Sequence, residues 1–394
     1  MPRDNLAEFF ISKELKFLSS KAFKNGFMWD VEKVRKPFEI CPRCSSKASV
    51  RCGKISITVR DAPVREKPLW LKIHKHRYYC KTCRKPFAEN VDCVWPRRRT
   101  THHFRKTVSD DCESYTNLSL VRKHHYCSSG FIYKVHYERL SKNLNQRKGL
   151  CWPKVIGIDE HFFSRSKGFT EFTTVFCDLK KRRLFEMCLG KDKKSMIEQI
   201  KNIPGREEVK VVVIDMSNGY RSFVKEYFPN AIIIADKFHM LRLITPALLK
   251  VRKEIHGHRQ DLFKRKLLLK KREDLDYFVR SDIDKYLSHH PELDELYRMK
   301  EKLREVYRCR GYRIAKKNLE RLIETMKTSL LEPVQRLRRT LITWKSEILN
   351  YFENRWTNGF TEAINGVAKG LQKRARGYKN FVNYRSKTLC ACFY

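Results

Sequence analysis

Three aspartates each follow a run of aliphatic residues of the kind that forms buried strands. The runs VIGID, VVVID and IIIAD end at Asp159, Asp215 and Asp236. Because ligand chemistry gathers at the carboxyl ends of parallel strands, we expect these three carboxylates to converge on one site. A single aspartate at a strand end is more often a helix cap or a turn residue, but three in one sheet favour a functional cluster.

Clustered carboxylates repel each other unless a cation neutralises them. Mg²⁺ is typically held by one or two carboxylates together with phosphate oxygens of a substrate. Two such ions about 4 Å apart can activate a water or a 3′-hydroxyl and stabilise the leaving oxygen. The aspartates therefore predict a metal-dependent enzyme that acts on phosphodiesters.

A later segment, residues 356–365, adds a carboxylate on a predicted helix. Helical spacing puts polar side chains on one stripe and apolar side chains on the opposite one. The polar stripe consists of Asn358, Glu362, Asn365 and Lys369. If it faces the aspartates, Glu362 adds a metal ligand and Lys369 adds a cation for phosphate. The alternative is a solvated surface helix, which has the same periodicity.

Two CxxC pairs, Cys41 with Cys44 and Cys80 with Cys83, lie in the first quarter of the chain. Four thiolates suit tetrahedral zinc, and the backbone amides of a CxxC turn hydrogen-bond the sulfurs. We expect one structural Zn²⁺ bound to these four cysteines. The alternatives are two unrelated pairs or a redox site, although redox chemistry needs only one pair.

The whole chain is strongly basic. Of its 394 residues, 85 are Lys or Arg and 44 are Asp or Glu, which gives a formal net charge of +41. Such a charge destabilises a fold by self-repulsion unless a polyanion neutralises it, so we expect nucleic acid as the partner. With 41% hydrophobic residues the chain is not intrinsically disordered, and no apolar run reaches the ~18 residues that span a bilayer. We expect a cytoplasmic protein with reduced cysteines and no membrane contact.

The elements that must position these residues divide the chain into a multidomain α+β protein. The β-like alternation between the CxxC pairs, the helical periodicities and the aliphatic runs set the boundaries. The predicted parts are a helical lead-in (1–40), a zinc ribbon that binds DNA (41–95), a helix-turn-helix domain (96–148), the first part of an α/β catalytic core (149–240), an all-helical insertion (241–352), and the rest of the core with the helical acid and a basic tail (353–394).

Residues 118–140 have the spacing of two short helices around a Cys-Ser-Ser-Gly break, which is typical of a helix-turn-helix. Recognition of DNA then falls to outward-facing residues of the second helix, with basic runs before it and in the tail contacting phosphates. The candidate DNA-binding residues are Tyr133, Lys134, His136, Tyr137 and Arg139 in the second helix, Arg97, Arg98 and Arg99 before it, and Lys373, Arg374 and Arg376 in the tail. The alternative is a three-helix packing unit without DNA contact.

Taken together, the motifs resemble bacterial insertion-sequence transposases of the ISL-three group, which carry a D-D-E catalytic set on a ribonuclease-H-like fold. The segments that carry the resemblance are CPRC, HRYYCKTCRKPFAE, VIGIDEHFF, VVVIDMSNGYRSFVKEYFPNAIIIADKFHMLRL and TNGFTEAINGVAKGLQKRARGYKNFVNYR. The resemblance implies that Asp159, Asp215 and Glu362 are the catalytic, magnesium-binding residues. Asp236 is then an extra metal ligand or a structural carboxylate, and His239 a candidate contact to the scissile phosphate.

The resemblance also implies that the zinc ribbon and the helix-turn-helix bind the terminal inverted repeats of a mobile element. We therefore expect a cut-and-paste DNA transposase that uses two Mg²⁺ (or Mn²⁺) ions per active site. It would act on transposon ends and target DNA as a homodimer or larger assembly. Two alternatives remain: a catalytically silent DNA-binding regulator derived from a transposase, and a structure-selective nuclease without strand transfer.

Overall fold

The computed structural model describes residues 12–115, 117–147, 149–166, 169–256 and 262–392. The chain forms two compact units, Met1–Asn143 and Leu144–Tyr394. Each unit contains both strands and helices, so the protein is α+β. Within the described residues, no helix combines the length and the apolar character needed to cross a membrane.

The first unit begins with a five-stranded sheet. Its strand order is β1-β2-β4-β3, and the short β5 pairs with the end of β4. β1 and β2 form an antiparallel pair, as do β3 and β4, whereas β2 and β4 run parallel. The strand bounds are β1 Leu15–Phe23, β2 Gly26–Lys33, β3 Ser49–Val64, β4 Lys67–Cys80 and β5 Pro86–Ala88.

The hairpin of β1 and β2 contradicts the helical lead-in that we predicted for residues 1–40, of which 1–11 lie outside the described residues. Lys24 and Asn25 form its two-residue turn, and buried and partly buried positions alternate over the second half of β2, which is the period of a strand. A Cβ at Gly26 would lie 2.4 Å from the Pro68 carbonyl oxygen, so glycine lets the hairpin pack closely on the start of β4. Pairing within the sheet, and not helical periodicity, therefore determines the secondary structure of this segment.

Three helices follow the sheet: α2 (His102–Ser114), α3 (Leu118–His125) and α4 (Ser129–Asn145). The residue just before each helix caps it, because its side chain accepts a hydrogen bond from a backbone amide of the first turn. The capping residues are Thr101 for α2, Asn117 for α3 and Ser128 for α4. Their buried apolar residues form a small core of their own. α3 ends where Tyr126 adopts a left-handed conformation, with φ of 50°.

The second unit is built on a five-stranded sheet of order β10-β9-β6-β7-β8. β6, β7 and β8 form an antiparallel meander, and β9 and β10 run parallel to β6. All four residues of β9 are buried, as expected of a continuous aliphatic run covered on both faces. The bounds are β6 Val155–Ser166, β7 Phe169–Asp178, β8 Arg183–Leu189, α5 Lys193–Ile200, β9 Val211–Ile214, α6 Asn218–Tyr227 and β10 Ile232–Ala235.

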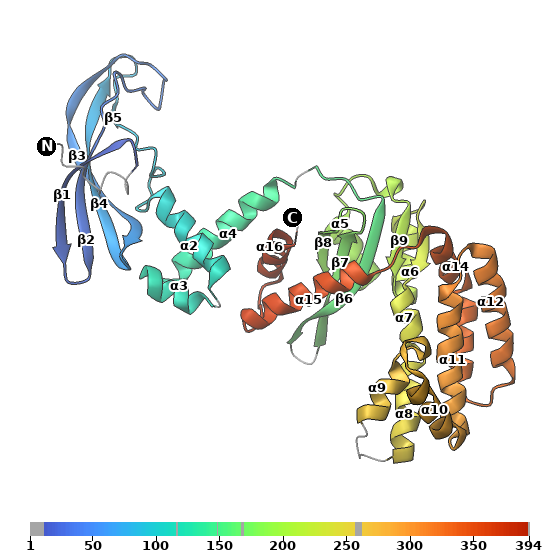
Figure 1. Ribbon diagram of the computed structural model, residues 1–394. Coiled ribbons are helices and arrows are strands. Elements are labelled where there is room, and N and C mark those ends of the chain that lie inside the picture. The colour runs from blue at the N-terminus through green and yellow to red at the C-terminus, as the bar shows by residue number, and fades with distance from the viewer. Residues whose placement is uncertain (1–11, 116, 148, 167–168, 257–261, 393–394) are drawn as a thin grey trace. The chain divides into compact units, whose positions relative to one another are not determined.

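After β10 the described chain is helical up to Asn354 (Figure 1). Leucines, tyrosines and tryptophans at helical spacing form the interior of this region, which is continuous with the core of the sheet. The last of these helices, α14, packs on β10, where the Asn350 side chain donates to the Ile233 carbonyl oxygen at 2.9 Å. The helices are α7 Lys237–Arg242, α8 Thr245–His256, α9 Leu262–Leu269, α10 Tyr277–Ser288, α11 Pro291–Arg308, α12 Tyr312–Thr325, α13 Glu332–Thr343 and α14 Lys345–Asn354.

The chain then returns to the sheet with α15 (Gly359–Arg374) and α16 (Phe381–Ala391). α15 packs against β6 and β7, and α16 packs against β8 (Figure 1). The helical region therefore separates two parts of the sequence, the strands and α15, that lie against each other in the fold.

Candidate functional site

The three aspartates form a row because of the register of three neighbouring parallel strands. β6 pairs with β9 up to Gly157 and Val213, and β9 pairs with β10 up to Ile214 and Ala235, so the same register aligns Asp159, Asp215 and Asp236 just beyond these pairs. The Asp236 amide donates a hydrogen bond to the Ile214 carbonyl oxygen at 2.8 Å, which extends the pairing to this row. Asp159 is not at a strand end as we predicted, because β6 continues to Ser166 in its pairing with β7. It marks instead the point where β6 leaves the parallel part of the sheet.

Burial makes the negative charge of this row costly. Asp159 is almost fully buried, and burial, together with the charge of Asp215, raises its pKa to about 6. Burial also raises the pKa of Asp215, although the hydrogen bond from His239 opposes that shift. Two carboxylates that are both hard to ionise and lie in each other's field favour a cation between them.

In the metal-free protein His239 supplies positive charge to the row. Its Nδ1 lies 2.8 Å from Oδ1 of Asp215 and 3.2 Å from Oδ2 of Asp236. The hydrogen bonds to these two carboxylates raise the pKa of His239 to about 10. One potential ligand atom from each of Asp215, Asp236 and His239 lies within 4.8 Å of the others, so the three are spaced for a metal ion. Neither Asp159 nor Glu362 belongs to that closest group.

Asp236 is completely buried, and both of its oxygens accept hydrogen bonds from backbone amides. Oδ2 caps α7, with the amides of Phe238 at 3.1 Å and His239 at 3.2 Å. Oδ1 accepts from the amide of Asn358 at 2.8 Å, just before α15. These contacts favour the structural alternative for Asp236, a carboxylate that joins β10, α7 and α15.

The polar stripe of α15 faces the row of aspartates. Asn358 donates from Nδ2 to the Ile158 carbonyl oxygen at 2.7 Å, and Asn365 donates from Nδ2 to Oδ2 of Asp159 at 2.8 Å. Glu362 lies one helical turn from each of these asparagines, on the same face of the helix. Its partly exposed carboxylate accepts a hydrogen bond from Arg242 of α7 at 3.2 Å. Glu362 therefore lies on the face of α15 that contacts β6, and its carboxylate is paired with Arg242.

Close approach of α15 to β6 depends on Gly157. A Cβ at this position would lie 2.3 Å from Oγ1 of Thr361 and 2.5 Å from Oδ1 of Asn358. Only glycine leaves the space for the helix at that distance. We did not predict this role, although a glycine inside a buried strand is a recognised sign of close backbone approach.

Three further residues at the site carried no sequence signal. His161 and Tyr384 make buried hydrogen bonds behind Asp159, and Arg242 pairs with Glu362. Lys369, the last residue of the predicted stripe, is exposed; burial lowers the pKa of His161, and the charge of Lys369 adds to that shift. Because these partners come from distant parts of the chain, spacing along the sequence does not reveal them.

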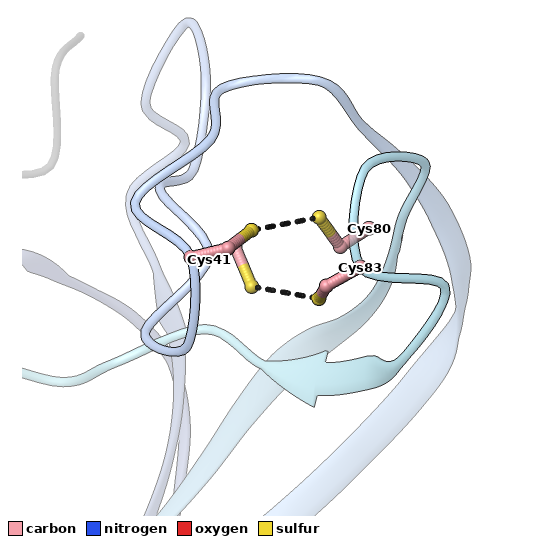
Figure 2. Close-up of side chains that lie close together, drawn as sticks. Cys41, Cys80 and Cys83 are labelled. Atoms are coloured by element: carbon pink, nitrogen blue, oxygen red, sulfur yellow. Dashed lines mark hydrogen bonds between the residues drawn. The ribbon is translucent and has the colours of Figure 1, made fainter.

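The four cysteines of the two CxxC pairs form a second, separate centre in the first unit. Sγ of Cys41 lies 3.6 Å from that of Cys83, and Sγ of Cys44 lies 3.5 Å from that of Cys80 (Figure 2). Tetrahedral zinc with Zn–S bonds of about 2.3 Å requires sulfurs about 3.8 Å apart, so the spacing fits the ion. Backbone amide donors lower the pKa of Cys41 and of Cys80, that of Cys80 to about 6. Burial raises the pKa of Cys83 to about 12, so thiolate formation is favoured at Cys41 and Cys80, and the zinc assignment rests on the spacing of the four sulfurs.

The residues predicted to contact DNA differ in their exposure. Tyr133 and Lys134 of α4 are exposed, as are the three arginines at 97–99 and the basic residues Lys373, Arg374 and Arg376 at and just beyond the end of α15. Tyr137 is half-buried and stacks on Tyr133 with ring centroids 6.0 Å apart. Arg139 pairs with Asp110 of α2, and Arg98 lies 3.6 Å from Glu138.

His136 is the one predicted DNA contact that the structure places in the interior. Its side chain is buried and contacts Ser109 of α2 at 3.3 Å. It lies on the same stripe of α4 as the buried Ile132 and Leu140, so it faces the helical core. Our prediction that it faces outward is therefore wrong.

Comparisons with known proteins match both segments of the chain that contain these centres. A family model described as a transposase of the ISL3 type, with a DDE catalytic domain, matches residues 156–388. A second family model, described as the zinc-finger of transposase IS204/IS1001/IS1096/IS1165, matches residues 37–83, which contain all four cysteines. The chain is also similar to the transposase for insertion sequence element IS1001 of Bordetella parapertussis, with 22% identity over 358 residues and 86% of each chain covered.

Proposed function

The chain belongs to the ISL3 family of DDE transposases, enzymes that act on DNA, and from this premise we propose how it acts. It binds the terminal inverted repeats of an insertion sequence, cleaves the DNA there and joins the freed ends to target DNA. Asp159, Asp215 and Glu362 are the proposed catalytic residues. The observation that carries the proposal is the row of aspartates at the polar face of α15, of which Asp159 and Asp236 are buried.

The sheet supports a ribonuclease-H-like core. Three antiparallel strands continue into two parallel strands, with helices on the crossover connections, in the order β10-β9-β6-β7-β8. The first aspartate lies on the central strand β6 and the second follows its parallel neighbour β9. This arrangement brings carboxylates from separate segments to one edge, where a helix from the far end of the chain adds the third acid.

The side chains of the row fit a divalent cation. Oxygen ligands suit Mg²⁺ or Mn²⁺, and because burial raises the pKa of both Asp159 and Asp215, a cation bound at the row would stabilise their charged forms. When bound by these aspartates and Glu362, two such ions would activate water or a 3′-hydroxyl and stabilise the leaving oxygen.

Two cationic side chains of the protein are paired with two of the proposed catalytic acids. His239 is hydrogen-bonded to Asp215, and Arg242 holds Glu362 in an ion pair. Both cations lie on α7, so this short helix neutralises two of the three acids in the metal-free state. We propose that DNA phosphate takes over these two cations when the acids take up metal.

The first unit is the proposed DNA-reading part. Its zinc centre stabilises the zinc ribbon. α3 and α4 are the proposed helix-turn-helix, and the exposed side chains of Tyr133 and Lys134 on α4 are its proposed DNA contacts. The basic residues beyond α15 and the net charge of +41 supply phosphate contacts. Because two element ends must be joined, we propose a homodimer or larger assembly on nucleoid DNA, with the helical insertion as the surface that brings the ends together.

Cleavage and strand transfer of a duplex that carries the element's end test the proposal. Glu362→Gln removes the third acid, and Glu353→Gln on the exposed face of α14 is a matched control. We expect Mg²⁺-dependent products from the natural protein and the control and none from Glu362→Gln, with equal binding of the end by all three. Full products from Glu362→Gln would refute the assignment. Tight binding without any product would favour the DNA-binding regulator, and cleavage without joining would favour the nuclease.

A further inference from the structure

A chain of hydrogen bonds leads from α16 to the first aspartate, and we infer that it positions the carboxylate of Asp159. The chain runs from Tyr384 through His161 and Asn365. None of these three residues is a proposed catalytic residue. The inference rests on the proposed function in one respect, namely that Asp159 is a metal ligand.

The contacts are continuous and short. Oη of Tyr384 lies 2.7 Å from Nε2 of His161, and Nδ1 of the same histidine lies 2.9 Å from Oδ1 of Asn365. Nδ2 of Asn365 lies 2.8 Å from Oδ2 of Asp159 and 3.4 Å from the Glu160 carbonyl oxygen. All three side chains are shielded from water, with exposures of 0% for Tyr384, 2% for His161 and 3% for Asn365.

The acceptors at the aspartate end fix the direction of every bond. A carboxylate and a carbonyl oxygen only accept, so the atom of Asn365 that contacts both is its NH2 group. The carbonyl oxygen of Asn365 then faces His161, whose Nδ1 must carry the proton. In the neutral ring Nε2 is then the unprotonated nitrogen, and the Tyr384 hydroxyl donates to it. His161 is thus held as the neutral Nδ1–H tautomer.

The far end of the chain is fixed to the sheet. Arg385, next to Tyr384 on α16, makes two hydrogen bonds to Glu186 of β8, at 2.7 Å and 2.5 Å. The Tyr384 ring also stacks on Phe163 of β6, with ring centroids 5.3 Å apart. The hydroxyl therefore has little freedom to move away from His161.

This arrangement decides which way the Asn365 amide faces. A flipped amide would place its oxygen against the Asp159 carboxylate and the Glu160 carbonyl, and its NH2 group against the N–H of His161. Each of these contacts joins two acceptors or two donors, so the chain opposes the flip at both ends. The donor to Oδ2 of Asp159 stays in place, and the carboxylate keeps one orientation toward Asp215. Tyr384, His161 and Asn365 are accordingly positioning residues.

A titration with Mn²⁺ tests the inference without any DNA reaction. The loss of the free-ion signal in electron paramagnetic resonance measures how much Mn²⁺ is bound. Tyr384→Phe removes only the hydroxyl. Tyr307→Phe is a matched control, because the Tyr307 hydroxyl is also buried but has no hydrogen-bond partner among the described residues. Substitution of a residue that orients a metal ligand typically lowers the affinity for the metal by about 10- to 100-fold. We expect about a tenfold loss for Asn365→Leu, several-fold weaker binding for Tyr384→Phe, and no change for Tyr307→Phe.

Asp159→Asn separates failure of this inference from failure of the proposed function. If Asp159→Asn weakens Mn²⁺ binding but Tyr384→Phe behaves like Tyr307→Phe, the positioning chain is refuted and the proposed function stands. If Asp159→Asn binds Mn²⁺ like the natural protein, Asp159 is not a metal ligand, and both fall.

The tautomer of His161 gives a second readout that does not depend on metal. Side-chain ¹⁵N resonances distinguish a protonated from an unprotonated ring nitrogen, and His161→Gln identifies the signals by their loss. We expect Nδ1–H and a bare Nε2 in the natural protein. An Nε2–H tautomer would overturn the inference whatever the Mn²⁺ titrations show.

Discussion

Replacement of Gly157 by alanine tests the placement of α15 on the catalytic strand. The added Cβ would lie 2.3 Å from Oγ1 of Thr361 and 2.5 Å from Oδ1 of Asn358, with Leu179 at 2.9 Å on a third side. To restore ordinary van der Waals separation the helix must retreat by about 1 Å. Overpacking of this kind costs about 1–3 kcal/mol of unfolding free energy. A displacement of about 1 Å in catalytic geometry can lower the rate by about 100-fold.

The matched control is Gly366→Ala on the exposed side of the same helix. No atom lies within 4 Å of a Cβ at Gly366, so alanine there should stabilise the helix by about 0.4–1 kcal/mol. Urea unfolding gives the free energies, and cleavage of an element-end duplex gives the rates. The reasoning is refuted if Gly157→Ala unfolds at the same urea concentration as the natural protein and cleaves DNA at the same rate.

Three further predictions concern zinc, protonation and DNA contact. Cys80→Ser should lose the bound zinc and the binding of the element's end, as measured by metal content and a band-shift assay, and normal binding without zinc would contradict the ribbon's role. Without metal, the raised pKa of His239 contributes stability that is full below about pH 6.5 and is lost as the pH rises toward 10. The melting temperature should therefore fall less over that pH range in His239→Gln than in the natural protein. An equal fall in both proteins would show that the pairing of His239 with Asp215 and Asp236 does not cause it. Binding of the end should weaken by about 10³ to 10⁵ between 50 and 200 mM salt, and Lys134→Ala should lower the salt slope by about one if Lys134 contacts phosphate.

The parts of the site that follow from local periodicity were predictable from the sequence. The aliphatic runs predicted the buried strands that bring Asp159, Asp215 and Asp236 into one row, although only Asp215 and Asp236 follow the carboxyl end of a strand. Helical spacing likewise put Asn358 and Asn365 on one face of α15, and both contact β6. The two CxxC pairs likewise predicted the four-cysteine cluster, because each CxxC turn brings two thiols together.

The remaining features depend on partners that are distant in the sequence. His161 and Tyr384 are 223 positions apart, and nothing in either segment indicates the other. The β1–β2 hairpin was read as helical because lysines interrupt its apolar residues, and only pairing with β4 explains its strand structure. His136 was assigned to the outer face of α4, but the packing of α2 against that helix buries it.

The central claim is that the buried aspartates hold the metal ions that drive DNA cleavage. Asp215→Cys tests it most directly, because a thiolate is a poor ligand for Mg²⁺ and a better one for softer ions. Cleavage of the element-end duplex is compared with Mg²⁺ and with Mn²⁺, using the natural protein as the control with each ion. We predict no product from Asp215→Cys with Mg²⁺ and recovered product with Mn²⁺, while the natural protein cleaves with both. Cleavage by Asp215→Cys at the natural rate with Mg²⁺ would contradict the claim.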